Sequence, residues 1–219
     1  MSKPLYIFDM DETLINADCA SLWNQFLVDQ GIVQDPDFMR QDQHLMQLYA
    51  QGDMAMEEYL AFAMSPLAGI PCQQVANWVD QCVEHYILPR QFPQAKQLVN
   101  SLLAQQQELL VISASVSFLV HAVAARLGIE QALGIDLQVV DGCYTEQITG
   151  IPSYREGKVA RLRQWLAEQN NRFDELHFYT DSINDLPLCL HADYAYLVNP
   201  CPQLAKYANQ PGWQQLHWG

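Results

Sequence analysis

Four short, mostly apolar runs, separated by segments of helical periodicity, constrain the possible fold of this chain more than any other feature. The runs are Leu5–Phe8, Leu109–Ile112, Leu176–Thr180 and Ala195–Val198. Each is short enough and apolar enough to be a strand buried on both faces of a sheet. Strands that alternate with helices form an open parallel sheet, so we predict an α/β fold. Ligands bind such sheets beyond the carboxyl ends of the strands, and a functional site is expected there.

Residues 16–90 lack any strand pattern and carry helical periodicity instead. We predict that they form a helical domain inserted into the sheet-containing domain, which takes residues 1–15 and 91–219. The 219 residues of the chain suit one domain with a large insertion. Within the second part of the sheet domain, Val139–Tyr144 is expected to form a hairpin, because Asp-Gly fits its tight turn.

The formal net charge of −14 excludes some classes of partner. It repels nucleic acid and anionic lipid, so we expect neither as a partner. The longest uncharged stretch, Leu109–Ala125, contains three serines and a histidine. It falls short of the about 20 apolar residues that a membrane span requires. If the substrate is a phosphate ester, the site itself must supply the cations that hold it.

The six cysteines form neither a Cys-x-x-Cys pair nor a spacing typical of a zinc site. The first residues lead directly into the apolar run at Leu5–Phe8, which leaves no room for a signal peptide. We therefore expect reduced thiols and a cytoplasmic protein. The sequence leaves the oligomeric state open.

Asp9 and Asp11 follow the first apolar run and are the strongest chemical signal in the chain. Side chains alternate along a strand, so these two point to one side and Met10 points to the other. Two carboxylates at the end of a buried strand repel each other, and a divalent cation relieves that repulsion. Oxygen ligands of this kind suit Mg²⁺. The alternative is that both residues cap a turn or the following helix.

Ser113 and Ala114 follow the second apolar run. At the end of a strand, the Ser113 hydroxyl and the backbone N–H of the next residue can both turn towards an anion. Ser115 and Ser117 are better explained as caps of the helix that follows.

Lys158 lies in the first turn of a predicted helix, Glu156–Glu168, where the helix dipole disfavours a cation. A nearby anion would explain that position, and a surface basic patch is the alternative. Asp181 follows the third apolar run and is placed to complete a metal site. Asp185 could orient Asp181 or Lys158, or cap the short helix that we expect there.

These four groups match one family in order and spacing. The chain resembles the haloacid dehalogenase superfamily, in the branch that contains phosphoserine phosphatase and histidinol-phosphate phosphatases. The motifs that carry the resemblance are Asp9-Met10-Asp11-Glu12-Thr13, Ser113, Lys158 within Arg155-Glu156-Gly157-Lys158, and Asp181-Ser182-Ile183-Asn184-Asp185. The resemblance implies a Rossmann-like parallel sheet and a helical cap inserted between the first two motifs, at residues 16–90.

The resemblance also implies roles for these residues in a Mg²⁺-dependent phosphatase acting on a small phosphate ester. Asp9 attacks phosphorus and forms an aspartyl phosphate. Asp11 protonates the leaving oxygen and later deprotonates the attacking water. Mg²⁺ is held by the Asp9 carboxylate, the Asp11 carbonyl and Asp181. The expected phosphate- and substrate-binding groups are Ser113, the Ala114 N–H, Lys158 and Asn184, with Asp185 in support.

The residues of the insertion indicate the kind of substrate. Asp18 matches an acidic position that phosphoserine phosphatases use for the substrate amine. Their carboxylate-binding arginine has no counterpart in Leu60–Met64. A buried carboxylate without a cation is costly, so an amine without a carboxylate fits better. We therefore expect histidinol phosphate or a similar amino-alcohol phosphate.

Several other functions are alternatives. Phosphoserine is the second candidate substrate, and a phosphomutase or phosphotransferase would use the same four groups. A non-catalytic phospho-ligand binding protein should have lost a charged group, and none is missing. A dehalogenase needs no second acid, so Asp11 argues against it.

Overall fold

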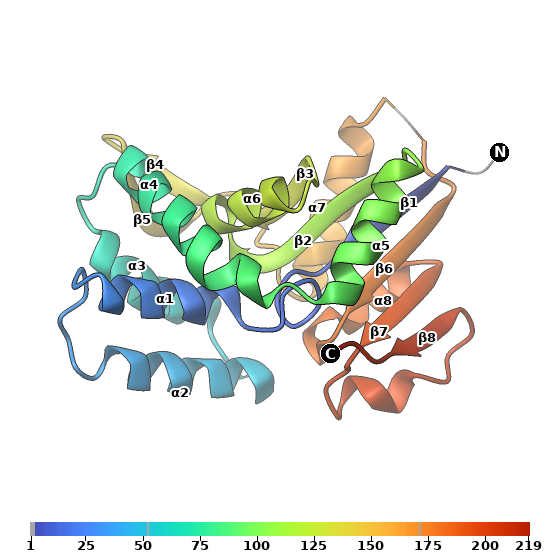
Figure 1. The fold of residues 1–219 in the computed structure, drawn as a ribbon, viewed down its shortest axis with the longest axis horizontal. Helices are drawn as coiled ribbons and strands as arrows, with labels where there is room; N and C mark the ends of the chain where they lie inside the picture. The colour runs from blue at the N-terminus through green and yellow to red at the C-terminus, as the bar shows by residue number, and fades with distance from the viewer. Residues whose placement is uncertain (1–2, 52, 171) are drawn as a thin grey trace.

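The computed structural model describes residues 3–51, 53–170 and 172–219. Its main sheet has six strands in the order β3-β2-β1-β6-β7-β8, and every neighbouring pair is parallel. The strands are β1 Pro4–Phe8, β2 Glu108–Val116, β3 Gln131–Ile135, β6 Glu175–Thr180, β7 Tyr194–Val198 and β8 Trp213–Leu216. The predicted α/β fold with a Rossmann-like parallel sheet is therefore confirmed (Figure 1).

Helices cover both faces of this sheet. Alternate residues of β1 are buried in different layers, with Ile7 in one apolar cluster and Phe8 in the other. The Phe8 cluster includes residues of α5 and α6, and the Ile7 cluster includes residues of α7 and α8. The helices are α5 Pro93–Ala104, α6 Ser117–Arg126, α7 Glu156–Glu168 and α8 Leu186–His191. Burial on both sides explains why β1 reads as a continuous apolar run.

The segment between β1 and β2 begins as a set of helices at the end of the sheet where β1 and β2 end (Figure 1). These helices are α1 Cys19–Asp29, α2 Phe38–Gln51, α3 Met56–Met64 and α4 Cys72–Cys82. After α4 the chain stays helical through a π-helical turn and a 3₁₀ turn that ends at Arg90. The two connections to the sheet lie side by side, since Ile15 bridges Gln91 and the Asn16 N–H donates to the Arg90 carbonyl at 2.8 Å.

A separate hairpin, β4 Leu137–Val140 and β5 Cys143–Ile148, extends the layer of inserted helices. Its turn residues Asp141 and Gly142 both have positive φ, as the Asp-Gly pair predicts. The hairpin contacts α3, and the Gly142 carbonyl accepts a hydrogen bond from the Cys72 N–H at 2.8 Å. Although these residues belong to the 91–219 segment in sequence, they pack against the insertion.

The structure differs from the sequence prediction at three strands. The edge strands β3 and β8 were not predicted, because β8 contains two glutamines and β3 contains Gly134, a residue that is unfavourable inside a strand. The Ala195–Val198 run is consequently not the last strand. Strand β2 continues to Val116, so Ser115 lies inside a strand and does not cap α6. Among the described residues, none of the helices is long and apolar enough to cross a membrane.

Candidate active site

The sequence-predicted side chains converge where β1, β2 and β6 end. Asp9 and Asp11 follow β1, Ser113 is near the end of β2, and Asp181 follows β6. Lys158 reaches the same place from the first turn of α7. Beside them lies a cavity of about 360 Å³, lined by residues of the sheet ends and of the inserted helices. That volume is at the small end of the range for small-molecule sites.

Lys158 is buried between two carboxylates. Its Nζ lies 2.9 Å from Asp9 Oδ1 and 2.7 Å from Asp185 Oδ1. Burial opposes the charge of Lys158, but Asp185 and Asp9 outweigh it and raise the pKa of the ammonium group above its usual value. The Thr180 hydroxyl donates to Asp185 Oδ2 at 2.7 Å, which fixes that carboxylate. Of the three roles considered for Asp185, the structure shows the contact with Lys158, and the Asp185 side chain makes no capping hydrogen bond to α8.

The positive charge of Lys158 does not fully compensate for the burial of the Asp9 carboxylate. Burial raises the pKa of the Asp9 carboxyl well above its usual value, and the Lys158 charge only partly offsets this. Asp185, Asp181 and Asp11 raise it further. A second cation beside Asp9 would lower this pKa and favour the ionised carboxylate.

The Asp11 side chain turns towards β2. Its Oδ2 accepts hydrogen bonds from the hydroxyls of Ser113, at 3.1 Å, and Ser115, at 3.2 Å. Its Oδ1 accepts the Cys19 N–H at 2.7 Å. The Ser113 hydroxyl, which we expected to face an anion, is thus engaged by Asp11. Sequence reasoning missed Ser115, although alternation along a strand puts residues 113 and 115 on one side.

Asp181 supplies a second, partly buried carboxylate near Asp9. The Thr13 hydroxyl donates to its Oδ1 at 3.2 Å. Burial, and after it the nearby Asp185, raises the pKa of Asp181 to about 8. A divalent cation bound beside these carboxyl groups would lower their raised pKa values.

The donor set fits Mg²⁺ if a main-chain oxygen takes part. Among the described residues, no group of three His, Cys, Asp or Glu side chains is arranged to hold a metal ion. The side chain of Asp11 is engaged with the serines of β2. Two carboxylates, of Asp9 and Asp181, together with the Asp11 carbonyl form an all-oxygen set, and Mg²⁺ usually keeps several waters besides such ligands.

Asn184 joins the site to the inserted helices. Its Nδ2 donates to the Tyr49 carbonyl of α2 at 3.1 Å, and its Oδ1 accepts from Arg155 Nε at 3.3 Å. Both ends of the amide are therefore used, although we expected it to bind substrate. The interaction with Tyr49 could not be read from the sequence, because the acceptor is a backbone oxygen.

Asp18 lies at the insertion end of the cavity and caps α1 by accepting the Ser21 N–H at 2.7 Å. Burial, and after it the nearby Asp11, raises the pKa of Asp18 to about 7. Ala114 lines the same cavity. So do four aromatic side chains, Trp23, Tyr49, Tyr59 and Phe118.

The cavity offers acidic groups and no basic side chain. Asp9, Asp11, Glu12, Asp18 and Asp181 line it, and none of its described lining residues is a lysine or an arginine.

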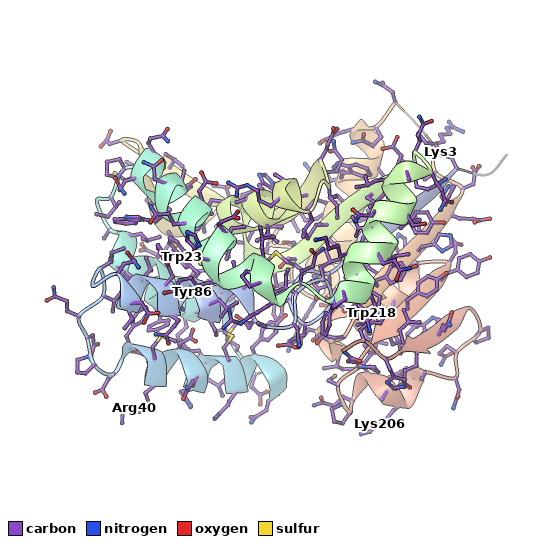
Figure 2. The ribbon with its side chains drawn as sticks, viewed as in Figure 1. Lys3, Trp23, Arg40, Tyr86, Lys206 and Trp218 are labelled. Atoms are coloured by element: carbon purple, nitrogen blue, oxygen red, sulfur yellow. The ribbon has the colours of Figure 1, made fainter. Side chains whose placement is uncertain are left out.

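The two arginines of the insertion are engaged elsewhere. Arg40 is exposed, points away from the rest of the molecule and pairs with Asp37 (Figure 2). Arg90 is exposed and donates to the Tyr86 carbonyl.

Comparison with known proteins places the chain among enzymes of one family. The family model described as haloacid dehalogenase-like hydrolase matches residues 6–189. A histidinol-phosphatase of Neisseria meningitidis is 36% identical, and the match covers 99% of each chain. A phosphoserine phosphatase of Idiomarina loihiensis is 25% identical, over 95% of this chain and 87% of its own.

Solved structures share the fold. A Bordetella pertussis Tohama I protein described as having unknown function is 33% identical, with a TM-score of 0.89 over 99% of each chain. The structure of a phospho-aspartyl intermediate analogue of phosphoserine phosphatase has a TM-score of 0.69. It covers 95% of this chain and 92% of its own at 19% identity, and that likeness concerns the fold alone.

Proposed function

Because the chain belongs to the haloacid dehalogenase-like hydrolase family, and is one of its phosphatases, we propose that it is a Mg²⁺-dependent enzyme for histidinol phosphate or a similar amino-alcohol phosphate. Hydrolysis of a phosphate monoester follows from its relatives. The metal, the intermediate and the substrate are the proposed part.

In the proposed reaction, Asp9 attacks the phosphorus atom and forms an aspartyl phosphate. Asp11 gives its proton to the leaving oxygen, and the product alcohol departs. Asp11 then removes a proton from the water that hydrolyses the aspartyl phosphate, which restores Asp9 and releases phosphate. The hydrogen bonds from Ser113 and Ser115 hold the Asp11 carboxyl in place for both steps.

Charge in this reaction is balanced by cations. Lys158 contacts Asp9 and neutralises charge that develops on the transferred phosphoryl group. Asp9, Asp181 and the Asp11 carbonyl would hold Mg²⁺, which would supply Lewis-acid stabilisation of the same group when bound. Ala114 lines the cavity, and its backbone N–H is a further candidate donor to a phosphoryl oxygen.

We further propose that residues 16–90 act as a cap on the core formed by residues 1–15 and 91–219. The paired connections at Ile15 and Gln91 are the natural hinge, because the chain crosses between the two parts only there. Closure would exclude bulk water from the phosphoryl group, as is usual for lids over reactive intermediates.

The observation that carries the substrate assignment is the composition of the cavity wall. Five acidic residues line it, and none of the described lining residues is basic. A substrate carboxylate would be buried there without a cation, which is costly, whereas an amine or an imidazolium finds negative charge and aromatic faces. The full-length similarity to a histidinol-phosphatase supports the same choice.

The test compares kcat/KM for histidinol phosphate, phosphoserine and glycerol phosphate side by side, with Asp9→Asn as the control for contaminating activity. We expect histidinol phosphate to be preferred and Asp9→Asn to be inactive on all three. Asn is nearly isosteric with Asp but cannot form the covalent intermediate. A preference for phosphoserine of tenfold or more would overturn the substrate assignment. Substantial residual turnover by Asp9→Asn would overturn the nucleophile.

A further inference from the structure

We propose that Arg155 is a positioning residue that holds the inserted helices closed over the active site by fixing the side chain of Asn184. This goes beyond the proposed function, because Arg155 takes no part in the chemistry described above. It relies on phosphatase activity only for its rate measurements.

The backbone of Arg155 is the first indication. Its φ of 52° and ψ of −124° lie in a region that glycine adopts readily and residues with a Cβ rarely adopt. The loop holds this conformation with local hydrogen bonds, since the Gly157 N–H donates to the Tyr154 carbonyl and the Lys158 N–H to the Arg155 carbonyl. A glycine would adopt this conformation with less strain, so the contribution of arginine must come from its side chain.

The side chain of Arg155 sets the orientation of the Asn184 amide. Its Nε donates to Asn184 Oδ1 at 3.3 Å, and its guanidinium lies over the Tyr154 ring, 4.9 Å from the centroid. With the amide oxygen facing Arg155, the amide nitrogen faces α2 and donates to the Tyr49 carbonyl at 3.1 Å. If the oxygen and nitrogen of the Asn184 amide exchanged places, the amide oxygen would face the Tyr49 carbonyl oxygen, and the two acceptors would repel each other.

The three residues come from three separate parts of the fold. Arg155 directly precedes α7, Asn184 follows β6, and Tyr49 belongs to α2 of the insertion. Asn184 is buried, and the Tyr49 ring lies 5.7 Å from the Tyr154 ring beside the same contact. Tyr49 also lines the cavity. The Arg155–Asn184–Tyr49 contact is therefore a link between insertion and core at the edge of the substrate cavity.

Arg155 also belongs to the loop that leads into the helix of Lys158. Its carbonyl accepts the Lys158 N–H at 3.0 Å, at the beginning of α7. The backbone of Arg155 thus helps to position Lys158, and its side chain helps to hold the insertion closed. Loss of the side chain alone should loosen closure while the backbone of α7 stays in place.

The experiment compares Arg155→Gly and Arg155→Ala with the wild type. Both variants delete the guanidinium, but only glycine relieves the backbone conformation. We expect both to lose about tenfold in kcat/KM on histidinol phosphate, the scale of one hydrogen bond. The loss on p-nitrophenyl phosphate should be much smaller, because an activated ester depends less on closure. Arg163→Ala, which removes an exposed arginine of α7, is the matched control and should behave as wild type.

Two further readouts separate positioning from a general structural role. Hydrogen exchange should be faster in both Arg155 variants at the peptide that contains Tyr49. Arg155→Gly should unfold at a higher temperature than Arg155→Ala, although both lose the same activity.

Wild-type exchange at that peptide in both variants, or equal losses on the two esters, would overturn the proposal. If the wild type fails to hydrolyse histidinol phosphate, the substrate assignment fails, but the exchange comparison still decides whether Arg155 holds the insertion.

Discussion

Lys158 places its ammonium nitrogen 2.9 Å from Asp9 Oδ1 in a region where both side chains are almost completely buried. The same nitrogen contacts Asp185, so one cation serves two carboxylates. Removing one partner of a buried ion pair leaves an uncompensated charge, which is far more costly than losing a surface pair. This arrangement makes the stability of the protein depend on the site that we propose for catalysis.

Replacing Lys158 with Met should destabilise the protein by about 3–5 kcal/mol at pH 7, because Asp9 and Asp185 then lack their cation. Urea unfolding measures the difference, with Lys96→Met, an exposed lysine of α5, as the control. Adding Asp185→Asn to Lys158→Met should recover part of the loss. A Lys158→Met variant as stable as the control would mean that the buried pair contributes nothing.

The sequence predicted the strands that are buried on both faces and the helices that bury one apolar face. Helix α7 has the bounds that the sequence indicated, and β1 and β7 lie within a residue of theirs. The edge strands β3 and β8 were not found in this way, since β8 contains two glutamines and β3 is interrupted by a glycine. The positions of Asp9 and Asp181 at strand ends predicted that they lie close together, because the carboxyl ends of parallel strands share one edge of the sheet.

Contacts of the site that depend on backbone atoms or unusual dihedrals left no sequence signal. Asn184 reaches the Tyr49 carbonyl across 135 positions, and any residue type can supply a carbonyl. The positive φ of Arg155 could not be predicted from the sequence either, because arginine is not a residue that indicates such a conformation. Ser115 was misread as a cap because the strand was expected to end before it.

Mg²⁺ should stabilise the protein in the absence of substrate. Binding to the folded state alone adds about 2.7 kcal/mol at a concentration a hundred times the Kd, so thermal unfolding should shift upwards. Asp181→Asn should lose most of that shift, whereas Asp141→Asn, on the exposed hairpin turn, should keep it. EDTA should abolish turnover and Mg²⁺ restore it. Full activity after thorough chelation would contradict the proposed metal.

Asp11→Asn should slow alkyl phosphates more than activated aryl phosphates. Asn can still accept the Cys19 N–H and can contact the serines of β2, so the fold should persist. General acid catalysis is worth about 10²–10⁴-fold, most of it for poor leaving groups. The measurement compares kcat on histidinol phosphate and p-nitrophenyl phosphate. Equal losses on the two would argue against Asp11 as the proton donor.

Asp18 should make stability depend on pH in a direction opposite to that of a paired carboxylate. Burial, and after it the nearby Asp11, raises the pKa of Asp18 to about 7 in the folded protein, from an ordinary value of 3.8. Between these values the folded state binds more protons than the unfolded state, so stability falls as the pH rises. The loss of stability caused by Asp18 is absent below the lower of these two pKa values and complete above the higher one.

Asp18→Asn removes that titration and keeps the cap of α1, since Asn caps helices about as well as Asp. The variant should therefore gain stability relative to wild type, and should gain more at pH 8 than at pH 5. Urea unfolding at the two pH values measures this, with Glu57→Gln, an exposed residue of α3, as the control. The same variant should lose kcat/KM on histidinol phosphate, because the substrate cation then has one carboxylate fewer to face. A stability gain of equal size at both pH values would show that Asp18 does not titrate in this range. Undiminished kcat/KM would show that the cationic group of the substrate binds elsewhere.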